Sequence, residues 1–274
     1  MTDTPRPVQP RLWQNLAMAS AAFGLAAMPS LAQGDYRAPS NAADMGATLW
    51  LAQTEGGEGG EADAVADLSD DVTYLARLSI VEGHIVASFD LYAKGMVDEA
   101  IGLSYHPEAE MMEDVRADIA AHGMPDVTPA MSAFSGTLER GATLEEAAGA
   151  LAHVQAAVAA AAAPEADNNR ARYDAMIAVI RAAASEYASA TEEGVVGDIM
   201  AYHEAHAFVA VARALAQGLA QTPETKAAAD KALIALQGAD EAFGDMNAAT
   251  LEARDPAILL GVAARVELVG SAVR

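Results

Sequence analysis

The chain has 274 residues, 53% of them hydrophobic, and 16 Lys and Arg residues stand against 39 Asp and Glu, for a formal net charge of −23. Such an acidic chain lacks the basic patches that bind phosphate, which argues against nucleic acid and anionic membranes as partners and leaves cations and basic proteins. It contains no cysteine, so disulfides, thiolate metal sites and cysteine nucleophiles are excluded.

The N-terminus has the three parts of a secretory signal peptide. Arg6 and Arg11 form a basic region, a mostly apolar stretch covers 12–31, and Ser30-Leu31-Ala32 provides a small-x-small cleavage site. We therefore predict a signal peptide over 1–32 and a periplasmic protein with no stable membrane span after cleavage. An uncleaved N-terminal anchor is the alternative.

The remaining chain divides into a linker and a helical region. Residues 33–69, with a Gly- and Glu-rich run at 55–61, are typical of a flexible acidic linker. From residue 70 on, apolar residues recur at spacings of three and four, and no run alternates as a strand would. We therefore predict an all-α helical bundle, with an N-terminal half over 70–163 and a C-terminal half over 164–274. The expected helices cover 70–94, 98–103, 107–122, 129–140, 144–163, 168–193, 199–220, 223–243 and 256–273.

The two predicted halves share a weak likeness. In each, a long helix ends at a glycine, Gly95 or Gly194, and a short acidic link follows. A Tyr-His pair, Tyr105-His106 or Tyr202-His203, then opens the next helix. Either duplication of one unit or chance similarity in an Ala-rich chain accounts for this pattern.

Histidine with carboxylate is the strongest metal-binding chemistry that this chain offers. His106 and Glu110 stand at i and i+4 in the helix that Pro107 opens, so they share one face. His84 lies in an apolar stripe of the first helix, where a histidine is either a ligand or a satisfied core residue. Its neighbour Gly83, which costs about 1 kcal/mol in a helix interior, indicates the close approach of another group. We predict that His84, His106 and Glu110 form one metal site or complete a site in the C-terminal half.

The C-terminal half holds the densest group of histidines. His203 and His206, at i and i+3, face the same way, whereas Glu204 diverges from them. Glu186, Glu192 and Glu193 from the preceding helix are the available carboxylates. We predict a metal site made by Glu186, Glu193, His203, Glu204 and His206.

Signatures of common enzyme sites are absent from the sequence. It has no Glu-x-x-His of di-iron bundles, no His-Glu-x-x-His, no Gly-x-Ser-x-Gly and no phosphate loop. We therefore predict that the protein is not an enzyme.

One stretch of about 25 residues, 184–208, follows a recognisable pattern. The matching positions are Glu186, Tyr187, Glu193, Gly194, Tyr202, Glu204 and Phe208. The pattern resembles that of the extracytoplasmic helical domain of bacterial high-affinity iron permeases. Ala201 replaces an acidic residue of that pattern, and His203 and His206 depart from it. The resemblance implies an iron-handling protein whose partner is an inner-membrane metal transporter.

These observations lead to one main hypothesis and two alternatives. The main hypothesis is a periplasmic helical protein that captures or hands over a metal ion, with iron first and copper or zinc as other choices. The first alternative is a non-catalytic periplasmic scaffold whose acidic surface binds a protein partner. The second, a redox enzyme or haem-binding bundle, rests on histidine and methionine alone.

Overall fold

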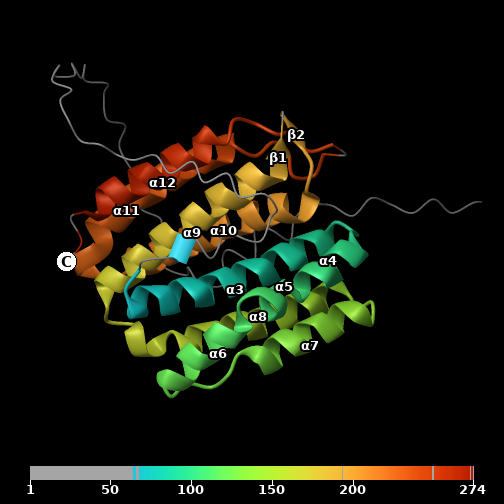
Figure 1. The fold of residues 1–274 in the computed structure, drawn as a ribbon, viewed down its shortest axis with the longest axis horizontal. Coiled ribbons are helices and arrows are strands. Elements are labelled where there is room, and N and C mark those ends of the chain that lie inside the picture. Colours follow the sequence, from blue (N-terminus) through green and yellow to red (C-terminus); the bar gives the residue numbers. More distant parts are fainter. Residues whose placement is uncertain (1–63, 66–67, 193, 249, 272, 274) are drawn as a thin grey trace, which may run out of the picture. The chain divides into compact units, whose positions relative to one another are not determined.

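The computed structural model describes residues 64–65, 68–192, 194–248, 250–271 and 273, all within one compact unit of the chain, 52–274. The predicted signal peptide and most of the predicted linker lie outside these residues. The described part is almost entirely helical (Figure 1), which confirms the predicted all-α bundle. The elements in chain order are α3 (Asp70–Ala93), α4 (Val97–Ser104), α5 (His106–Glu110), α6 (Met112–Ala121), α7 (Thr128–Glu139), α8 (Leu144–Ala161), η1 (Ala163–Glu165), α9 (Asn169–Ala190), β1 (Thr191–Glu192), β2 (Val195–Val196), α10 (Ile199–Leu219), α11 (Pro223–Gln237), η2 (Gly238–Glu241) and α12 (Ala257–Gly270).

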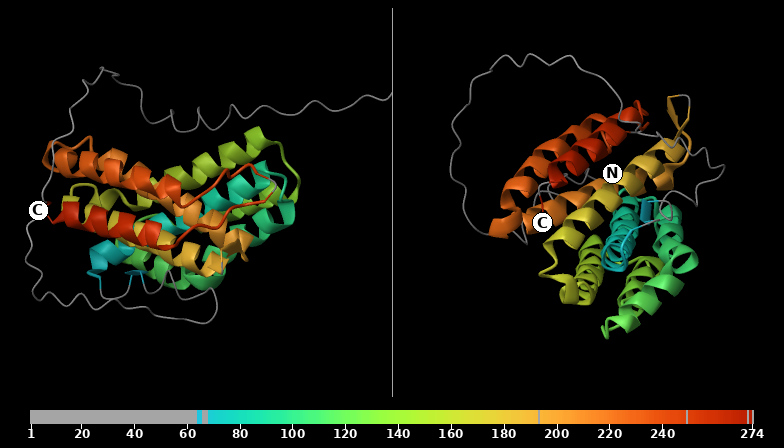
Figure 2. Two further views of the ribbon diagram at one scale, coloured as in Figure 1. Left: turned by 90° about the horizontal axis from the view of Figure 1, so that it is seen from above. Right: turned by 60° about the vertical axis from the view of Figure 1, so that its left-hand side comes forward.

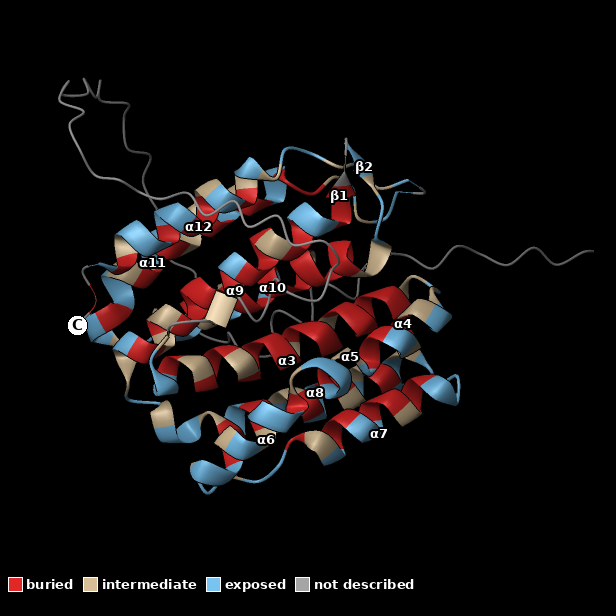
Figure 3. Ribbon diagram, in the orientation of Figure 1, coloured by how far each residue is buried: buried red, intermediate tan, exposed pale blue. Residues whose placement is uncertain are grey.

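Helix α3 is the central element of the bundle, because it packs against α4, α8, α9 and α10. Of its 24 residues, 17 are buried, and Figure 3 shows buried residues along almost all of its length. A helix that is buried all round has no solvated face for polar side chains. His84 and Asp90, both buried on α3, must therefore find partners inside the protein.

Two large apolar cores lie on either side of the contact between α3 and α10. One is built mainly from α9, α10, α11 and α12, and the other mainly from α3, α4, α6, α7 and α8. Ile80 of α3 belongs to the first core, and Ala207 of α10 belongs to the second. Figure 2 shows the two groups of helices from two further sides. The line along which α3 meets α10 is thus the interior boundary between the cores.

Two local features differ from the sequence prediction. The single helix expected over 107–122 is wrong, because the chain breaks at Met111, whose φ of −140° and ψ of −13° are not helical. The strands β1 and β2 form a small antiparallel pair that the sequence did not predict, and Gly194 supplies the positive φ of 80° in its turn. In the described part of the chain, no helix is both long enough and apolar enough to cross a membrane.

Candidate metal centre

The antiparallel helices α3 and α10 pack against each other (Figure 1). They approach closely at Gly83, the neighbour of His84. At Gly83, an added Cβ would lie 2.2 Å from Cδ1 of Phe208, so only glycine leaves room for that ring. The Phe208 ring in turn meets the His84 ring edge-on, with centroids 5.4 Å apart. The close approach that the sequence indicated at Gly83 is therefore confirmed, and it brings α10 within reach of His84.

The His84 imidazole is fixed in one orientation. Its side chain is 1% exposed, and its Nδ1–H donates to the backbone carbonyl of Ile80 at 2.9 Å. In the neutral ring this bond leaves a lone pair on Nε2. That atom lies 3.3 Å from Oε1 of Glu204 and 3.5 Å from Oε2 of Glu110. A histidine held by a backbone carbonyl, with its other nitrogen toward carboxylates, is arranged as metal-binding histidines are.

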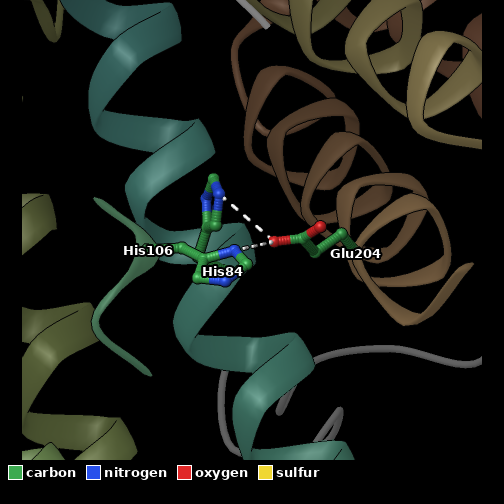
Figure 4. Close-up of side chains that lie close together, drawn as sticks. All are labelled: His84, His106 and Glu204. Atoms are coloured by element: carbon green, nitrogen blue, oxygen red, sulfur yellow. Dashed lines mark ion pairs between the residues drawn. The ribbon is translucent and has the colours of Figure 1, made fainter. Parts of the chain in front are cut away.

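Helix α5 brings the second histidine to the same place. It has five residues, with Pro107 buried in its first turn, and it ends at Met111. Its i and i+4 residues face each other as predicted, since Nδ1 of His106 lies 3.7 Å from Oε1 of Glu110. Nδ1 of His106 is also 3.5 Å from Oε1 of Glu204 (Figure 4). Glu204 of α10 thus faces both rings.

The spacing of these atoms suits a metal ion. The ligand atoms of His84, His106 and Glu204 all lie within 4.8 Å of one another, with Glu110 bordering them. In a tetrahedral site with bonds of about 2.0–2.2 Å, ligand atoms are about 3.3–3.6 Å apart. The four nitrogen–oxygen distances here run from 3.3 to 3.7 Å. These residues form a His/Glu group that could hold a metal ion.

The charges at the group are out of balance without a cation. Oε1 of Glu204 is buried and makes no hydrogen bond within the described part of the chain, although both imidazoles are near it. The Glu204 carboxylate raises the pKa of His106 above its ordinary value, against the effect of burial. Burial alone would raise the pKa of Glu110, but His84 and then His106 lower it below the ordinary value. Lone pairs and carboxylates that converge in this way require a proton or a metal cation between them.

The other two predicted histidines lie outside the group around His84; His203 is buried and His206 is half-buried. Nδ1 of His203 is 2.6 Å from Oδ2 of Asp90, whose other oxygen lies 3.1 Å from Nζ of Lys94. Burial alone would raise the pKa of Asp90, but the bond to His203 and the charge of Lys94 lower it below its ordinary value. The His206 ring meets Phe243 edge-on at 5.1 Å, and burial lowers its pKa to about 4. Sequence reasoning missed Asp90, which carries no local signal because it stands 113 positions from His203.

The predicted carboxylates from the helix before α10 are not among the residues that the structure places in the group around His84. Glu186 is buried on α9 and does not belong to the three-residue group of His84, His106 and Glu204. Glu193 lies outside the described residues. The described structure therefore brings His84, His106 and Glu110 together with Glu204. Glu204 belongs to the other predicted site, and on α10 it faces away from His203 and His206.

No protein-family model, curated protein or solved structure matches the chain. The resemblance to iron-permease domains stays a prediction, and the function rests on the geometry of the site.

Proposed function

We propose that the protein binds a divalent transition-metal ion through His84, His106 and Glu204, with Glu110 as an additional carboxylate. The observation that carries this proposal is the buried Oε1 of Glu204. It has no hydrogen bond among the described residues and lies 3.3 and 3.5 Å from two imidazole nitrogens. A metal ion would satisfy this oxygen and would have both imidazole nitrogens as ligands.

Iron(II) is the first choice of metal. Two histidines and one carboxylate with open positions suit iron(II), and the same donors also suit zinc. Two imidazoles and two carboxylates carry a charge of about −2 when the rings are neutral, which a divalent ion balances.

The exposure of the ligands supports a role in capture and hand-over of the ion. His84 and Glu204 are 1% and 7% exposed, whereas His106 and Glu110 are 33% and 30% exposed. Because one side of the site is buried and the other is accessible, an ion can arrive and leave on the side of His106 and Glu110, the two residues of α5. We propose that this exchange takes place in the periplasm, with an inner-membrane transporter as the receiving partner, as the N-terminal segment and the resemblance led us to expect.

The test is metal content of the full chain after dialysis against iron(II) under anaerobic conditions, and separately against zinc and copper. At pH 7.5 we expect the double variant His84→Ala, His106→Ala to bind one equivalent of metal fewer than the parent. The matched control is His203→Ala, His206→Ala, which removes two histidines of α10 outside the group. Circular dichroism establishes that each variant is folded.

The result also depends on pH in a defined way. Affinity falls below about pH 6, because protons compete for the imidazoles. Full binding at pH 5, or equal binding by the parent and the His84, His106 variant, would contradict histidine ligation. No binding by the folded parent would leave the protein-binding scaffold as the better hypothesis.

A further inference from the structure

A second group of metal-ligating side chains lies where three helix ends meet. Asp71 is in the first turn of α3, His122 follows the last residue of α6, and Glu165 is in η1 between α8 and α9. One ligand atom from each lies within 4.8 Å of the others. No residue of this group belongs to the centre around His84.

The His122 ring is held in place from two sides. Its Nδ1–H donates to the carbonyl of Asp118 at 2.8 Å, the same i−4 bond that fixes His84. The ring also stacks on Tyr74, with centroids 3.9 Å apart and planes 4° from parallel. Its Nε2 consequently faces Oε1 of Glu165, at 4.0 Å. An imidazole fixed in this way presents its lone pair to the carboxylates without further ordering.

The two carboxylates are held by one amide. The side-chain nitrogen of Asn168 donates to Oδ2 of Asp71 at 3.1 Å and to Oε2 of Glu165 at 2.9 Å. Asn168 is itself fixed, because its Oδ1 accepts from the backbone N–H of Ala171 as the N-cap of α9. The amide thus occupies one oxygen of each carboxylate and leaves Oε1 of Glu165 toward His122.

No strong cation balances these carboxylates in the described part of the chain. Arg77, on the same helix as Asp71, is bound by Asp114 and Asp118 at 2.8 Å each. Among the described residues, neither Asp71 nor Glu165 forms an ion pair with lysine or arginine. Burial, then Asp118 and Glu165, raise the pKa of Tyr74 under the His122 ring, which agrees with a negative potential here.

We propose that Asp71, His122 and Glu165 form a second, peripheral site for a divalent transition-metal ion with zinc-like preference for nitrogen and oxygen donors. An ion bound there joins the start of α3 to the end of α6 and to the α8–α9 connection. It therefore stabilises the folded chain, since these segments separate on unfolding. The proposal does not depend on the first site.

The experiment isolates the second site by titrating Zn²⁺, as zinc chloride, into the full chain carrying His84→Ala and His106→Ala. We expect about one remaining equivalent by calorimetry and a rise in melting temperature with zinc. Adding His122→Ala should weaken that binding at least about tenfold and abolish the rise. The control adds His153→Ala instead, which removes an exposed histidine of α8 and should change neither quantity.

Three outcomes would overturn the proposal. They are no zinc binding before His122 is changed, unchanged binding after it is changed, and an equal loss with His153→Ala. Because removal of the His122 ring also removes its stacking on Tyr74, Glu165→Gln is measured in parallel; it keeps the ring and should lower zinc affinity at least about tenfold. The difference between the parent and the His84, His106 variant reports the first site separately, so either site can fail alone.

Discussion

Replacing Glu204 by Gln separates metal binding from the stability of the metal-free fold. The carboxylate oxygen Oε1 is buried, has no hydrogen bond to any described residue, and lies 3.3 Å from Nε2 of His84. An amide N–H at that position can donate to the Nε2 lone pair, and a hydrogen bond contributes about 0.5–1.5 kcal/mol. We therefore expect the free energy of unfolding of metal-free Glu204→Gln at pH 8 to be about 1 kcal/mol higher than that of the parent.

The same change should remove most of the stabilisation by metal. At an ion concentration of 100 times the parent's Kd, binding adds about 2.7 kcal/mol to the free energy of unfolding. Loss of an outer partner already weakens metal sites by about 10–100-fold, so loss of a ligand should weaken binding at least about 100-fold. At the same ion concentration, the variant then gains only about 0.4 kcal/mol. For a domain of this size these gains are about 5–11 °C and about 1 °C in Tm.

The assay is thermal unfolding followed by circular dichroism at pH 8, without metal and with iron(II) or zinc. Every protein in it carries His122→Ala, so that the second proposed site does not contribute. The control variant is Glu186→Gln, which changes another buried glutamate outside the group and should keep the parent's metal-dependent rise in Tm. The reasoning is refuted if Glu204→Gln gains as much as the parent from metal.

Two further substitutions test the surroundings of the site. Gly83→Ala should destabilise the protein by about 1–3 kcal/mol and weaken metal binding, because its Cβ would lie 2.2 Å from Phe208 Cδ1 and displace the ring beside His84. Urea unfolding measures the loss against Gly102→Ala, whose Cβ meets nothing within 4 Å and whose stability should not fall; equal effects would contradict the close-packing account. Asp90→Asn should cost about 1–3 kcal/mol at pH 7 while leaving metal stoichiometry unchanged, since Asp90 binds His203 outside the metal group. The pKa of Asp90 is lowered in the folded protein, so the stability that its carboxylate contributes is present above about pH 4 and is lost as pH falls through the folded pKa. A stability deficit of Asp90→Asn that stays constant down to pH 3 would contradict this account.

The helices were predictable because each one is marked locally. Apolar residues recur at helical spacing, and glycines such as Gly95, Gly123 and Gly141, all with positive φ, end helices where the sequence places them. The break at Met111 was not predictable, since methionine is a good helix former and nothing there punctuates the chain. The strand pair around Gly194 is also too short to produce an alternating pattern.

The candidate metal centre was predictable only within single helices. His106 and Glu110 come together because i and i+4 spacing fixes their relation, and Gly83 marks the approach of α10. The partner across that approach depends on how α10 is rotated about its axis, which sequence spacing does not determine. One step along α10 separates Glu204, which faces His84, from His203, which faces Asp90. Counting histidines favoured His203 and His206, which the structure does not place in the group around His84.

His206 provides a last test of this rotation, because its surroundings should make the fold sensitive to acid. Burial lowers its pKa to about 4 from 6.5, so the folded protein keeps the ring neutral while the unfolded chain takes up a proton. Between those values the unfolded state binds more protons, and stability falls as pH falls, by at most about 3 kcal/mol in all. His106 acts oppositely, since its raised pKa gives stability that is present below pH 6.5 and lost as pH rises through its folded value. We expect His206→Leu to remove about 2–3 kcal/mol of the parent's loss in unfolding free energy between pH 6.5 and 4.5, measured in urea. His153→Leu should leave the loss unchanged, and an equally steep pH dependence in His206→Leu would mean that the ring is open to water.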